Sequence, residues 1–254
     1  MASVPIVASK FEIGRVIGET FSGIKRNWAV LTVLSAGVAV ASALLNVMVL
    51  RRLVDVAALQ TNPAAMFLSP GYWVTVTGGA FLNAFASSAL LTVLVGKGKA
   101  LPDAISGGVR FFLPMLALML LWTIGVSIGM MLLIVPGIIL ATMWSVSTPA
   151  LVAENMGVFG AFGRSRALTK GIRWNVFGAL LVFAIVFYVI IFAIQGLGGG
   201  SMTLFSNTAM AFFVAMTTSI FFTLLIPSFL AVLYVEAVNA KDGGSRSELA
   251  EIFN

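Results

Sequence analysis

The residues best suited to chemistry in this sequence form a short basic cluster next to a tryptophan. The cluster consists of Arg164, Arg166, Lys170, Arg173 and Trp174. Cations at a membrane surface can hold phosphate or anionic lipid headgroups, at about 1 kcal/mol per cation. The alternative is plain anchoring, because lysine and arginine mark the cytoplasmic side of membrane proteins. The cluster is therefore our candidate lipid-headgroup or phosphate site, with anchoring as the alternative.

Two carboxylates lie at positions where an unpaired carboxylate is energetically unfavourable. Glu154 and Glu236 each follow a long apolar run, at the expected end of a membrane helix. We expect them to form buried ion pairs with arginines of interfacial segments, and Arg26 and Arg110 are the candidate partners. The alternative is a proton or cation site. A proton-coupled carrier normally has an ionisable group at mid-depth in a span, and the sequence offers none.

No set of residues for catalysis or metal binding is found in the sequence. The chain has no histidine and no cysteine, which removes the commonest general base and the commonest metal ligand. It also contains no HExxH, GxSxG or Walker sequence. We therefore predict no catalytic residue, no metal and no cofactor, in a protein that is not an enzyme.

The composition requires lipid as the solvent for most of the chain. Of the 254 residues, 60% are hydrophobic and only 9% are charged, and the mean hydropathy is +1.07. A soluble domain carries about 25% charged residues. The formal net charge of +6 arises beside few acids, so we interpret the basic residues as topology signals and not as a nucleic-acid surface. Residues 1–254 are predicted to form a single integral membrane domain.

Six spans can be placed in the charge-free parts of the chain. A helix needs about 20 apolar residues to cross the hydrocarbon core. The first run follows Lys25 and Arg26 and reaches Leu50, so we interpret it as a span and not as a cleaved leader. Turn-forming residues divide the longer runs. The predicted spans are 27–50, 72–95, two helices within 111–153 broken at Pro136-Gly137, and helices near 174–194 and 208–235 on either side of QGLGGGS.

The basic residues give an orientation. Thirteen of the 15 lysines and arginines lie in four segments of the chain. These segments are the part before the first span, the loop between the second and third spans, the loop between the fourth and fifth spans, and the tail after the sixth span. The positive-inside rule then predicts cytoplasmic N- and C-termini in a bacterial inner membrane. The exceptions, Arg51 and Arg52, lie at a helix end, from which long side chains reach the headgroups.

An internal repeat is predicted from three similar blocks. Each block has an arginine, a serine or threonine four residues before it and an aromatic residue just after it: 19–31, 103–115 and 166–178. Every block precedes a pair of spans. The pattern predicts three units of interfacial amphipathic helix plus transmembrane hairpin, over 9–96, 97–153 and 154–254. Convergence on an arginine-plus-aromatic anchor is the alternative.

The third block has the clearest helical spacing. Arg166, Lys170 and Arg173 fall at i, i+4 and i+7, which predicts one polar face. Such a helix lies in the headgroup plane, with its apolar face toward protein or acyl chains. The residues predicted on the apolar face are Phe162, Leu168 and Ile172.

The second half of the chain carries features of a known family. Within 132–178 these are Pro136-Gly137, Trp144, Pro149, Glu154, Arg164-Ser165, Leu168-Thr169 and Trp174. With the tail 233–253, they make the chain resemble the membrane domain of some bacterial glycerophosphodiester phosphodiesterases and of related stand-alone inner-membrane proteins. The catalytic phosphodiesterase domain, with its histidine and carboxylate metal site, is absent. The resemblance therefore implies a place near glycerophospholipid metabolism or envelope maintenance, and no activity.

These observations lead to one functional prediction. We expect a non-enzymatic inner-membrane protein that binds anionic glycerophospholipids or supports envelope and lipid homeostasis. The alternative is a small carrier or channel for a lipid-derived or amphipathic solute. The expected partners are anionic membrane lipids and not nucleic acid, and a homo-oligomer or an unidentified protein partner stays open.

Overall fold

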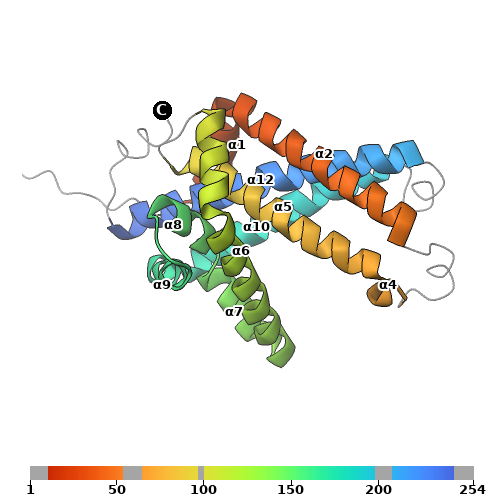
Figure 1. Cartoon of the computed structure of the whole chain (residues 1–254). Helices are drawn as coiled ribbons and strands as arrows, with labels where there is room; N and C mark the ends of the chain where they lie inside the picture. The colour runs from red at the N-terminus through yellow and green to blue at the C-terminus, as the bar shows by residue number, and fades with distance from the viewer. Residues whose placement is uncertain (1–10, 54–64, 97–99, 198–207, 243–254) are drawn as a thin grey trace, which may run out of the picture.

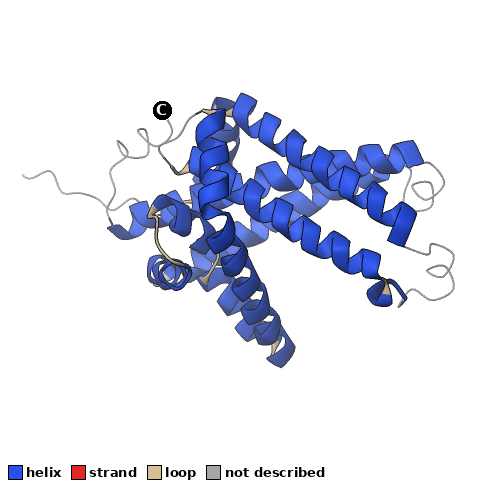
Figure 2. Cartoon of the chain, in the orientation of Figure 1, coloured by secondary structure: helices blue, strands red, loops and turns tan. Residues whose placement is uncertain are grey.

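The computed structural model describes residues 11–53, 65–96, 100–197 and 208–242, and every regular element in those ranges is a helix (Figure 2). The predicted all-α class is confirmed. In chain order the helices are α1 (Ile13–Arg26), α2 (Trp28–Leu53), α4 (Ala65–Leu68), α5 (Pro70–Leu94), α6 (Leu101–Leu132), α7 (Ile134–Met143), α8 (Ser147–Ala153), α9 (Val158–Thr169), α10 (Arg173–Leu197) and α12 (Thr208–Asp242).

Six segments of the described chain are long and apolar enough to cross a membrane, as predicted. Five of them lie in single helices, and the fourth is divided between α7 and α8. The spans are Trp28–Asn46, Pro70–Leu94, Leu101–Leu132, Ile134–Ala153, Arg173–Ile194 and Met216–Lys241. The α10 span is the most hydropathic and the least buried, so its side chains face lipid, whereas the α12 span is the most buried. The chain is thus an all-α polytopic membrane protein.

Helix α12 is the central helix of the bundle. It packs against α1, α2, α5, α8 and α10, and its buried side chains include Phe229 and Leu233. The hairpin of α6 and α7 extends away from the spans of α2, α5 and α12 (Figure 1). That hairpin is joined to the bundle mainly through α5, which packs closely against α6.

Small residues allow α5 and α6 to approach each other. A Cβ placed on Gly107 would lie 2.1 Å from Thr92 Oγ1, and one on Gly108 would lie 2.8 Å from the Phe85 ring. The close approach also lets Ser88 Oγ donate a 3.0 Å hydrogen bond to the Gly108 carbonyl. Membrane helices use small residues and hydroxyl bonds in this way, because apolar surface alone gives no drive to associate in lipid.

The third and fourth spans meet at Leu133, and not at the predicted Pro136-Gly137. Leu133 is extended, with φ −161 and ψ 142, and it separates α6 from α7. Pro136 lies in the first turn of α7, where its missing N–H costs no helical hydrogen bond. The predicted position is wrong because this proline follows a helix start and does not break a helix. Gly137 faces Gly129, since a Cβ on Gly129 would lie 3.0 Å from the Gly137 Cα.

The three predicted interfacial segments have different structures. The first is the separate helix α1, which ends at Asn27. The third is α9, and it is followed by a turn in which Gly171 adopts a φ of +95. The second segment has no break, because α6 continues through Arg110 into its span. The threefold repeat remains a prediction, and its boundaries at 9, 97 and 254 lie outside the described residues.

Candidate functional site

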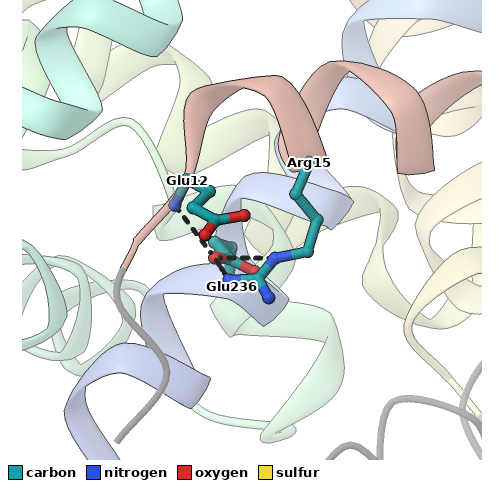
Figure 3. Close-up of polar contacts among 3 residues, drawn as sticks. All are labelled: Glu12, Arg15 and Glu236. Atoms are coloured by element: carbon teal, nitrogen blue, oxygen red, sulfur yellow. Dashed lines mark hydrogen bonds and ion pairs between the residues drawn. The ribbon is translucent and has the colours of Figure 1, made fainter.

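The buried carboxylate of Glu236 is held by the start of α1. Glu236 is 4% exposed, near the C-terminal end of α12. Its Oε1 accepts hydrogen bonds from Arg15 Nη2 at 2.5 Å, from Arg15 Nε at 3.2 Å and from the backbone N–H of Glu12 at 3.3 Å (Figure 3). Glu12 is the N-cap residue of α1, whose N–H has no acceptor within the helix. The carboxylate therefore satisfies both a guanidinium and the helix N-terminus.

The pair with Glu236 holds Arg15 in its charged form. Its hydrogen bond to Glu236 raises the pKa of Arg15 above the ordinary value of an arginine. Desolvation opposes this effect, and the negative charges of Glu236, Glu12 and Glu19 add to it. Removing one partner of a buried pair leaves the other uncompensated, at a cost of about 3–5 kcal/mol. The pair thus fixes α1 on α12, across 221 positions of sequence.

Glu154 is the centre of a second polar cluster, directly after α8. Its Oε1 accepts hydrogen bonds from Arg164 Nε of α9 and from the Tyr234 hydroxyl of α12, each at 2.7 Å. The next residue, Asn155, has a φ of 48, a left-handed conformation that asparagine tolerates. Asn155 Oδ1 accepts a 3.1 Å hydrogen bond from Arg110 Nη2 of α6. The loop after α8 thus ties α6, α9 and α12 together.

The arginine partners differ from the predicted ones. Glu236 is paired with Arg15, because α1 meets Glu236 with its first turn and the candidate Arg26 is the last residue of that helix. Glu154 is paired with Arg164, and the guanidinium of the candidate Arg110 bonds Asn155. Arg15 lies in the first turn of α1, ahead of the predicted block 19–31. No local signal pointed to Tyr234.

Helix α9 packs one face on the end of α7. Ser165 Oγ donates a 2.8 Å hydrogen bond to the Met143 carbonyl, and Leu168 is completely buried. The Phe162 ring packs on Trp144 with 4.8 Å between centroids. Ile172, just beyond α9, also packs against the core. The prediction that Phe162, Leu168 and Ile172 face inward is confirmed.

The predicted polar face of α9 is not formed by one helix. The helix ends at Thr169, and the turn at Gly171 precedes α10. Lys170 therefore caps α9, and Arg173 begins α10. The prediction of a single i, i+4, i+7 face was wrong because the glycine, with its positive φ, ends the helical register.

The five residues of the basic cluster have different surroundings. Arg164 is engaged by Glu154, and Arg173 is partly buried. The other three are exposed, Trp174 by 84%. We call Arg166, Lys170 and Trp174 the exposed basic strip.

Two buried nitrogens at the ends of α10 and α12 lack a hydrogen-bond partner in the described structure. They are Arg173 Nε and Asn239 Nδ2. Asn239 is 4% exposed and lies one turn beyond Glu236 on α12. A buried donor without an acceptor costs about 1–3 kcal/mol. Arg173 is recognisable in the sequence as part of the basic cluster, whereas Asn239 is not, because a single asparagine near a helix end has no distinguishing spacing.

An apolar groove lies between α1, α10 and α12. Its lining includes Phe21, Phe183, Phe187 and Phe229, and its one hydroxyl, from Thr20, donates within α1 to the Val16 carbonyl at 2.7 Å. Neither of the two paired carboxylates lines this groove. The groove therefore presents hydrocarbon surface and no charge.

The fold and the site define a class of protein. It is an all-α polytopic membrane protein in which carboxylates at the ends of two spans pair with arginines of separate helices. Within the described ranges, no group of three or more carboxylates is placed to hold a metal ion.

Comparison with known proteins gives one partial match. The chain is 33% identical over 101 residues to a UPF0259 membrane protein of Pectobacterium carotovorum subsp. carotovorum (strain PC1). The match spans 40% of this chain and 40% of the length of that relative. No protein-family model matches the chain, and no solved structure matches it. The likeness and the six spans together indicate a bacterial membrane protein.

Proposed function

We propose that this chain is a non-enzymatic inner-membrane protein that holds anionic glycerophospholipids at its exposed basic strip. Both termini and the strip face the cytoplasm, where the leaflet is anionic. The role is to retain or organise such lipids during envelope and lipid homeostasis.

One observation carries the proposal, namely the joint exposure of Trp174, Arg166 and Lys170. Tryptophan favours the membrane interface, where its ring meets acyl chains and its N–H reaches headgroups. No acidic residue occurs between Asn155 and Val235, so that stretch supplies no carboxylate to neutralise the strip. Each exposed cation then gains about 1 kcal/mol from an anionic leaflet.

The resemblance to the membrane domain of glycerophosphodiester phosphodiesterases supports the same lipid class. Among the residues that carry it, Trp174 belongs to the strip, Glu154 and Arg164 form an ion pair, and Trp144 packs on Phe162 of α9. A membrane module near glycerophospholipid turnover would need to hold the same headgroups.

The carrier alternative receives less support. A cavity that reaches Glu154 or Glu236 would favour a small carrier or channel for a lipid-derived or amphipathic solute. The groove between α1, α10 and α12 is apolar, and Glu236 is already held by Arg15.

The test is native mass spectrometry of lipids that co-purify with the full chain. Wild-type protein should retain phosphatidylglycerol or cardiolipin, and the double substitution Arg166→Gln with Lys170→Gln should retain clearly less. The matched control removes two other exposed cations, Lys25 and Arg26, from α1. Equal lipid retention in all three proteins would contradict the proposal. If the strip variant alone also inserted with inverted orientation, the strip would be a topology signal only.

A further inference from the structure

We propose that the C-terminal end of α12 and the N-terminal end of α10 form a site for a phosphate oxyanion. In this site Arg173 Nε and Asn239 Nδ2 donate hydrogen bonds, and Lys170 and Lys241 supply additional positive charge. The inference rests on the proposed function, because it names the group of an anionic lipid that the protein recognises and the place where that group binds.

The register of α10 and α12 places the two donors at the same level of the helix pair. The helices are antiparallel, and three contacts join them or their ends: the Phe183 and Phe229 rings at 4.0 Å, the Phe187 and Phe222 rings at 4.6 Å, and Lys241 Nζ with the Lys170 carbonyl at 3.0 Å. In two antiparallel helices with the same rise per residue, residue numbers increase along one helix while they decrease along the other. Two residues at the same level therefore have residue numbers with nearly the same sum. The numbers of Arg173 and Asn239 have this sum. They therefore lie level with each other, between the aromatic contacts and the lysine contact.

As the two side chains lie, both unpartnered atoms are donors. Both Arg173 Nε and Asn239 Nδ2 carry N–H groups, so neither can satisfy the other. The carboxylate of Glu236, one turn before Asn239 on α12, is directed to Arg15 and the N–H of Glu12. A ligand with several oxygen lone pairs would satisfy both donors at once.

The local charge selects an anion as that ligand. Arg173 is the first residue of the 25-residue helix α10, whose first N–H groups have no acceptor within the helix. The partial positive charge of this helix end adds to the charge of Arg173 and of the exposed Lys170 and Lys241. Guanidinium and helix N-termini are both suited to phosphate oxygens. Trp174 follows directly, so a lipid phosphate in the site would have its acyl chains beside an interfacial ring.

The decisive variant is Asn239→Asp. The new carboxylate is nearly the same size, accepts from Arg173 Nε and repels an incoming phosphate. We expect its melting temperature without ligand to rise above that of wild type, and its stabilisation by phosphate to disappear. The matched control is Asn175→Asp, which adds the same charge at an exposed position of the first turn of α10. The control should keep most of the ligand-induced shift.

The measurement is the melting temperature of delipidated full chain in neutral detergent. The probes are inorganic phosphate, phosphatidylglycerol and the phosphate-free lipid diacylglycerol. Stabilisation of the wild type by phosphatidylglycerol alone identifies a lipid headgroup as the source, and stabilisation by inorganic phosphate as well identifies a site open to the free anion. Arg173→Gln should lower the affinity for either phosphate ligand about tenfold, as expected for the loss of one charge-assisted hydrogen bond. Arg166→Gln should lower that affinity much less.

The results separate this inference from the proposed function. If wild-type protein retains anionic lipid but Asn239→Asp and Arg173→Gln respond to both phosphate probes like wild type, the site is absent and the proposed function stands. If neither phosphate probe stabilises the wild type, the site is likewise refuted. Failure to retain any anionic lipid during purification would instead refute the proposed function.

Discussion

The hydroxyl of Tyr234 and the side chain of Arg164 meet on a single oxygen, Oε1 of Glu154, each at 2.7 Å. Through this atom, the residue that follows α8 is joined to α9 and to the central helix α12. Arg164 and Tyr234 thus hold the carboxylate at the end of the fourth span, as Arg15 holds Glu236 at the end of the sixth span.

Removal of the tyrosine hydroxyl should loosen this junction. Tyr234→Phe keeps the ring but takes one donor from the partly exposed Glu154 carboxylate. We expect a loss of about 1 kcal/mol in the free energy of unfolding, measured by denaturant titration in detergent. Tyr188→Phe is the control, because Tyr188 is 71% exposed on α10. An equal effect of the two substitutions would contradict the role assigned to the hydroxyl.

Removal of the Arg15 charge should cost more, since it leaves Glu236 buried without its cation. Arg15→Gln is expected to lower the free energy of unfolding by about 3 kcal/mol. The double variant, Arg15→Gln with Glu236→Gln, should recover at least half of that loss because two amides can bond each other. If the double variant were as unstable as the single one, packing and not charge would explain the contact.

The same pair predicts a pH dependence. The pKa of Arg15 is raised on folding, so its stabilising contribution is fully present below the ordinary pKa of arginine and is lost only as pH rises through the folded value. The coupling between Arg15 and Glu236 should therefore be equal at about pH 6 and about pH 10. Arg15→Lys should lose its coupling from about pH 10.4 upward, the ordinary pKa of lysine. Double-mutant cycles at several pH values measure the coupling of Glu236 to Arg15 and to the lysine of the Arg15→Lys variant.

The contact between α6 and α7 should not accept a side chain at Gly137. A Cβ there would lie 2.7 Å from the Met130 backbone nitrogen, so Gly137→Ala must push the two helices apart. The expected loss is about 1–3 kcal/mol in unfolding free energy. Gly163→Ala on α9 meets nothing within 4 Å and should be neutral or stabilising by up to about 1 kcal/mol.

The proposed orientation can be mapped with single cysteines, because the chain has none of its own. Cysteines introduced near positions 100, 165 and 254 should react only with reagents on the cytoplasmic side, and cysteines near 60 and 200 only with reagents on the opposite side. Labelling of position 254 from outside would refute the orientation.

The sequence predicted the membrane class and the six spans because both depend on local quantities, namely run length, hydropathy and turn residues. Two local signals were misjudged. Pro136 was assigned to a helix break although its position in a first turn is allowed, and the break that Gly171 makes before Arg173 was not foreseen. The partners Arg15 and Tyr234 depend on how distant helices pack, which no spacing within one segment encodes. Glu154 and Glu236 could nevertheless be singled out, because an acid directly after an apolar run needs a partner.

The contact of Arg15 with Glu236 can form only late in the synthesis of the protein. Arg15 leaves the ribosome 221 residues ahead of its partner. At a translation rate of about 5–20 residues per second, α1 exists for roughly 10–45 s before Glu236 is synthesised. During that interval the insertion machinery receives five spans while α1 lacks its partner on α12. The end of α12 therefore completes this contact, and a ribosome stalled before Glu236 would hold a chain in which α1 is not yet fixed on α12.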